Sequence, residues 1–82
     1  MMLNQHGFWS LHMERIAVRS STIALIGYDV EALTLEVEFK NGTIYAYDGV
    51  PAEIHEGIMK CDSHGKYLNA KVKGRFPYRR VR

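Results

Sequence analysis

The sequence predicts an α+β fold: a small three-stranded antiparallel β-meander, then two helices and an extended basic C-terminal segment. Three observations lead to this prediction. Apolar and polar residues alternate over residues 34–40, a period typical of a half-buried strand. Asn41-Gly42 follows, a pair that favours a hairpin turn. Beyond Pro51, apolar residues recur at helical spacings. With 82 residues and 46% hydrophobic composition, the chain can bury one small core.

The first strand is predicted over residues 20–28, which are rich in apolar and β-branched side chains, with a turn at residues 29–32. Residues 1–12 follow neither the helical nor the strand period. The sequence therefore predicts an N-terminal extension over residues 1–12 and a single domain over residues 13–82.

The hairpin sets an expected register for the next two strands. A two-residue type I′ loop at Asn41-Gly42 places Val37 opposite Ala46, Glu38 opposite Tyr45 and Glu36 opposite Tyr47. Directly opposed residues share a face of the sheet. The residues that this register assigns to the core are Val37, Phe39, Ile44 and Ala46. Tyr45 and Tyr47 are then expected on the other face, beside Glu36 and Glu38.

This tyrosine pair allows three interpretations. Exposed aromatic residues on neighbouring strand positions stack bases in sheet-based RNA readers. Alternatively, the C-terminal segment folds back over the pair, with Arg75 or Arg79 bound to Glu36 and Glu38. A second copy of the chain is a third candidate to cover the tyrosines, because the strand at residues 20–28 is apolar on both faces.

Two helices are predicted after the hairpin. The first begins with Pro51 in the favoured first position and carries an apolar stripe through Ile54, Ile58 and Cys61. Gly57 interrupts this helix and indicates close packing against a neighbour. Ser63 is the expected N-cap of the second helix, and Gly74 the expected left-handed residue at its end.

Charge is divided unevenly along the chain. Residues 14–62 hold all nine acids and four bases, whereas residues 63–82 hold seven bases and no acid. Such a segregated basic segment suits a polyanion, since each neutralised phosphate releases counterions. A solvated tail, or bases that pair with the protein's own acids, would give the same pattern. The seven bases are Lys66, Lys71, Lys73, Arg75, Arg79, Arg80 and Arg82.

Cys61-Asp62-Ser63-His64 contains nucleophile and base types, with His55 nearby. Sequence neighbours seldom place a thiolate and an imidazole in line, and the spacing matches no established zinc ligand set. We therefore expect no catalytic residue, no metal and no cofactor. The single cysteine excludes an internal disulfide, and the absence of an apolar run long enough for a membrane span favours a cytoplasmic protein.

A series of short motifs resembles the KTSC domain, which is named for the C-terminal extension of some lysyl-tRNA synthetases. The motifs are Val18 with Ser20-Ser21, Ile26-Gly27-Tyr28-Asp29, Leu35-Glu36-Val37-Glu38-Phe39, Asn41-Gly42, Tyr45-Ala46-Tyr47, Val50-Pro51, Ser63-x-Gly65-x-Tyr67-x-Asn69 and Gly74-Arg75-Phe76-Pro77-Tyr78. The resemblance covers roughly residues 13–81. It implies a small α+β module of unknown activity, for which the synthetase context suggests RNA binding. Cys61 stands where the family pattern has a small residue such as Ala, which argues against a catalytic cysteine.

The sequence thus favours a small non-enzymatic module that binds RNA through its basic C-terminal region. The candidate phosphate contacts are Lys66, Lys71, Lys73, Arg75, Arg79 and Arg80, and the candidate aromatic platform is Tyr45 and Tyr47. The alternative is a protein-interaction or self-assembly module of bacterial or phage origin, forming a homo-oligomer through the two-sided sheet and Phe8-Trp9.

Overall fold

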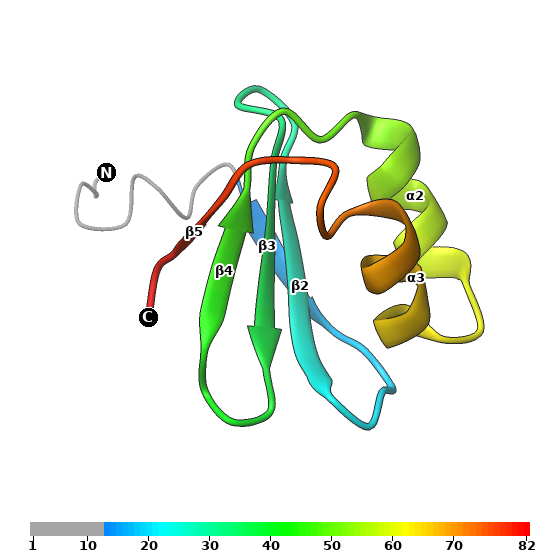
Figure 1. Ribbon diagram of the computed structural model, residues 1–82. Helices are drawn as coiled ribbons and strands as arrows, with labels where there is room; N and C mark the ends of the chain where they lie inside the picture. Colours follow the sequence, from blue (N-terminus) through cyan, green and yellow to red (C-terminus); the bar gives the residue numbers. More distant parts are fainter. Residues whose placement is uncertain (1–12) are drawn as a thin grey trace.

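The computed structural model describes residues 13–82, which form a five-stranded antiparallel sheet with two helices on one of its faces (Figure 1). The predicted extension at residues 1–12 lies outside the described residues. Each strand pairs with its neighbours in sequence, in the order β1-β2-β3-β4-β5. The elements are β1 (Met13–Ala17), β2 (Ile23–Asp29), β3 (Thr34–Phe39), β4 (Ile44–Tyr47), α2 (Ala52–Lys60), α3 (His64–Lys71) and β5 (Tyr78–Arg80).

The predicted α+β class is confirmed, but the predicted strand count was wrong. The expected meander corresponds to β2, β3 and β4, and the structure adds a strand at each edge of it. The extended C-terminal segment forms β5, which lies beside β4 (Figure 1). No helix within residues 13–82 combines the length and apolarity needed to cross a bilayer.

The core lies between the helices and the face of the sheet that they cover. Its buried side chains come from three strands and both helices, so the sheet and the helices each bury the apolar face of the other. These side chains, with the loop residue Val50, are Ile23, Ile26, Leu35, Val37, Tyr47, Val50, Ile58, Leu68 and Val72.

An irregularity in β2 brings two of these residues to the same face. Ile26 pairs with Val37, but the register shifts between Ile23 and Leu25, so that Ile23 pairs with Phe39. The extra residue between them, Ala24, has no partner in β3. Without it, Ile23 would share a face with Leu25 and point away from the helices.

The β3–β4 hairpin differs from its predicted form by one loop residue. The Phe39 amide donates to the Thr43 carbonyl at 2.8 Å, and the Gly42 amide donates to the Phe39 carbonyl at 2.9 Å. These bonds close a three-residue loop, residues 40–42, in which Gly42 is left-handed at φ +93°. The predicted two-residue loop was therefore wrong.

The longer loop exchanges the faces of β4. Val37 pairs with Tyr45 and Glu38 with Ile44, instead of Val37 with Ala46. Tyr45 and Tyr47 consequently share the helix-covered face with Val37. Ile44 and Ala46 are buried, as predicted, but they lie with Glu36 and Glu38 on the helix-free face of the sheet, not on the face of Val37.

Gly42→Ala should lower the free energy of unfolding by about 1 kcal/mol, because an L side chain disfavours the left-handed conformation. A Cβ at Gly42 meets no atom within 4 Å, so the backbone conformation alone sets the loss. Gly42→Asn should cost less, since Asn tolerates this region. Urea unfolding measures both; equal stability of the Ala variant and the wild type would contradict the assigned loop.

Ion pairs connect the strands across the helix-free face. Arg15 of β1 contacts Glu36 of β3, with its Nε 2.9 Å from the Glu36 Oε1. Arg79 of β5 binds both oxygens of Asp48, at 2.8 and 2.6 Å. The predicted pairing of Arg75 or Arg79 with Glu36 and Glu38 was therefore wrong. The Glu38 partner is Arg82, at 3.4 Å, and the Arg75 Nε donates to the Ala70 carbonyl.

The two helices follow the predicted signals closely. Pro51 was predicted as the first residue of α2, but it is the N-cap, so the helix begins one residue later. The Ser63 hydroxyl caps α3, as predicted, by accepting from the Lys66 amide. Gly74 is left-handed, at φ +79°, two residues beyond the C-cap Val72. Gly57 packs closely against α3, where its neighbour is the Tyr67 phenol ring.

Candidate nucleic-acid interface

Aromatic side chains gather where β4 pairs with β5. Tyr47 pairs with Tyr78 in the sheet, and the Tyr78 ring centroid lies 5.6 Å from that of Tyr45 and 5.9 Å from that of Tyr47. Phe39 extends the group, at 5.9 Å from Tyr45. Tyr47 is 2% exposed and belongs to the core, whereas Tyr78 is 64% exposed. The accessible aromatic surface is therefore formed by Tyr78 and the half-buried Tyr45.

A hollow of about 310 Å³ opens beside these rings, lined by Tyr45, Tyr47, Lys73, Gly74 and Tyr78. The Lys73 ammonium lies 5.7 Å from the centre of the Phe39 ring, a cation-π distance. Burial raises the pKa of the Tyr47 hydroxyl, and Tyr45 and Tyr78 raise it further, so Tyr47 remains a neutral phenol at physiological pH.

Arg80 completes this group. It pairs with Tyr45 in the β4–β5 register, so both residues lie on the same face of the sheet. We call Tyr45, Lys73, Tyr78 and Arg80 the tyrosine surface. Aromatic rings and cations are thus brought together from β4, β5 and the turn after α3.

The structure separates the other predicted phosphate contacts from this surface. Arg79 alternates with Arg80 along β5 and lies on the helix-free face, bound to Asp48. Lys66 and Lys71 are exposed on α3 and do not line the hollow, and the Arg75 side chain donates to the Ala70 carbonyl. Sequence reasoning missed Tyr78, because its role depends on the pairing of β5 with β4.

The Cys61 and His64 pair does not have the geometry of a nucleophile and its base. Their Sγ and Nδ1 atoms lie 3.6 Å apart, but each also contacts the Ile58 carbonyl, at 3.1 and 2.6 Å. Nδ1 facing a carbonyl oxygen must carry the proton and cannot accept one from the thiol. Burial raises the pKa of Cys61, which keeps the thiol protonated.

His55, the third residue of this predicted set, lies elsewhere. It stacks on Tyr28 with ring centroids 4.6 Å apart, and burial lowers its pKa. Within residues 13–82, no three His, Cys, Asp or Glu side chains are grouped to hold a metal ion.

Comparison with known proteins places this fold in a family. The KTSC domain model matches residues 19–76. An uncharacterised protein of Stutzerimonas stutzeri is 41% identical over 61 residues, which are 74% of this chain and 86% of that protein. A lysine-tRNA ligase of Nostoc punctiforme is 31% identical over 61 residues, but the match covers only 11% of the ligase. The crystal structure of a KTSC domain protein from Yersinia pestis superposes with a TM-score of 0.80 at 38% identity, covering 85% of this chain and 99% of that one. With both the sequence and the fold in agreement, this chain is a member of the KTSC domain family.

Proposed function

We propose that this KTSC domain is a small non-enzymatic module that binds RNA through the tyrosine surface. The observation that carries the proposal is the exposed Tyr78 ring beside Lys73 and Arg80, within residues 63–82, which contain seven bases and no acid. Aromatic rings stack bases and neighbouring cations hold phosphates, as in other single-strand readers.

The hairpin register keeps the carboxylates of β3 away from the tyrosine surface. Had Tyr45 and Tyr47 shared a face with Glu36 and Glu38, the carboxylates would have opposed a phosphate backbone. Instead these acids lie on the helix-free face, where Arg15 and Arg82 pair with them. The lysine-tRNA ligase relatives add a weaker argument, because the name of those enzymes identifies tRNA as a substrate.

A salt-dependent binding titration tests this proposal. Fluorescence anisotropy with a labelled RNA should show affinity falling as salt rises, with a log-log slope of about −0.7 for each phosphate contacted on a single strand. Lys73→Gln and Arg80→Gln should each weaken binding and reduce the slope by about 0.7. Tyr78→Ala should weaken binding on the order of tenfold.

Arg79→Gln is the matched control, since it removes the same charge from the adjacent β5 residue on the opposite face. It should leave the slope unchanged. The proposal fails if micromolar protein binds no RNA at low salt, or if Arg79→Gln and Arg80→Gln weaken binding equally.

The alternative is a self-assembly module, and one observation favours it. Ile16 is 43% exposed on β1, whose outer edge pairs with no strand within the described residues. The unpaired backbone groups of an edge strand are a template for pairing with another chain. Light scattering distinguishes this case: a mass that rises with concentration and falls in Ile16→Lys would support it, whereas a constant monomer mass would exclude it.

A further inference from the structure

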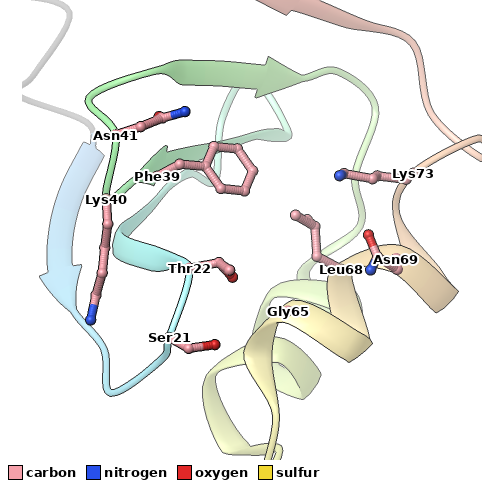
Figure 2. A pocket seen from close by; sticks show the side chains of 9 residues that line it. All are labelled: Ser21, Thr22, Phe39, Lys40, Asn41, Gly65, Leu68, Asn69 and Lys73. Carbon is pink, nitrogen blue, oxygen red and sulfur yellow. The ribbon is translucent and has the colours of Figure 1, made fainter.

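Three neighbouring hollows lie along α3, the first of them beside the tyrosine surface. The first hollow shares Lys73 with a second hollow of about 450 Å³, which Figure 2 shows between α3, the β3–β4 loop and the segment before β2. That middle hollow shares Ser21, Thr22, Lys40 and Gly65 with a third, also of about 450 Å³. We call this series of neighbouring hollows the α3 groove.

The middle hollow has the chemistry of a nucleobase pocket. Phe39 and the buried Leu68 give it apolar walls, and the amides of Asn41 and Asn69 stand at its rim (Figure 2). Asn41 Oδ1 accepts from the Thr43 amide, so its nitrogen is left as a donor. An apolar slot with a few polar groups at its rim suits a flat heterocycle whose edge carries donors and acceptors.

The third hollow suits a phosphate. Arg19 and Lys40 supply two cations there, and Ser21 and Thr22 supply hydroxyls. Asp62 is the one carboxylate among the described residues that line the three hollows, against the cations Arg19, Lys40 and Lys73. His64 also lines this hollow. The groove therefore complements a polyanion along its length.

We infer that the α3 groove selects single-stranded RNA, with one unstacked base in the middle hollow against Phe39 and an adjoining phosphate beside Lys40 and Arg19. This inference rests on the proposed function and makes it more specific. A base inside a duplex is stacked and paired, so it cannot enter the hollow. The neighbouring base on the strand then stacks on Tyr78, at the other side of Lys73.

The test compares a labelled eight-nucleotide single strand with a duplex of the same sequence, by anisotropy at one low salt concentration. The wild type should bind the single strand at least about tenfold more tightly, the loss that follows when one base cannot stack. Phe39→Leu should reduce single-strand affinity about tenfold. Lys40→Gln should reduce the salt slope by about 0.7.

Asn69→Ala provides a variant that does not perturb the core, because Asn69 is exposed. It should weaken single-strand binding without changing the salt slope, since no charge is lost. Lys71→Gln is the control for Lys40→Gln, because Lys71 is an exposed α3 residue outside all three hollows.

The failures are distinguishable. The groove inference is overturned, and RNA binding at the tyrosine surface stands, if Asn69→Ala and Lys40→Gln bind the single strand like the wild type while Arg80→Gln binds it weakly; equal binding of duplex and single strand overturns base stacking in the groove and on Tyr78 together. If no variant and no wild-type protein binds either RNA, both proposals are overturned together.

Discussion

Gly57→Ala should lower the free energy of unfolding by about 2 kcal/mol, although alanine is the better helix former by about 1 kcal/mol. The cause is the packing of α2 on α3. A Cβ at Gly57 would overlap the phenol of Tyr67, with the ring carbon Cζ only 2.6 Å away. Either the ring must turn or the helices must separate, and both disturb a close-packed core.

The sign of this effect should reverse when the ring is removed. In a Tyr67→Ala background, Gly57→Ala should increase stability by up to about 1 kcal/mol, because only the helix propensity remains. Urea unfolding of the four proteins in this cycle gives the coupling directly. A loss of equal size in both backgrounds would contradict the contact.

Arg15→Ala should destabilise the fold by about 2 kcal/mol, because it leaves the Glu36 carboxylate without its cation in a poorly hydrated position. The two side chains are 24% and 11% exposed, so the pair lies between a surface and a buried salt bridge. Arg15 is also in β1, which pairs only with β2 among the strands of residues 13–82. Hydrogen exchange should therefore accelerate most in β1.

Glu36→Gln separates the charge from the packing. The amide has nearly the shape of the carboxylate but needs no counterion, so Arg15→Ala should cost much less in a Glu36→Gln background. Equal losses in the two backgrounds would show that Arg15 stabilises β1 through its other contacts instead.

The central strands could be predicted from the sequence because their pattern is intrinsic to them. Alternation along Leu35, Val37 and Phe39 identifies β3 wherever its neighbours lie. The edge strands lack such a signal. All three residues of β5 are exposed, so only its backbone hydrogen bonds to β4 define it as a strand.

The residues of the candidate site could be predicted only in part. Residues 63–82 contain bases and no acid, and this composition indicated Lys73 and Arg80 as candidate phosphate contacts. The composition could not show that Arg79 lies on the opposite face of the sheet. Asn41-Gly42 correctly indicated a hairpin, yet the pair is compatible with two loop lengths. The choice between them decides which residues Tyr45 faces.

That loop makes the position of the tyrosines a question of parity. A strand has only two faces, so the number of residues between Phe39 and Thr43 assigns every side chain of β4 to one or the other, with no intermediate state. Substitutions along β4 can change what Tyr45 contacts but cannot move it across the sheet. A single deletion in the loop would carry the ring from the cations of the α3 side to the acids of the other, and the same amino acids would then place carboxylates around Tyr45.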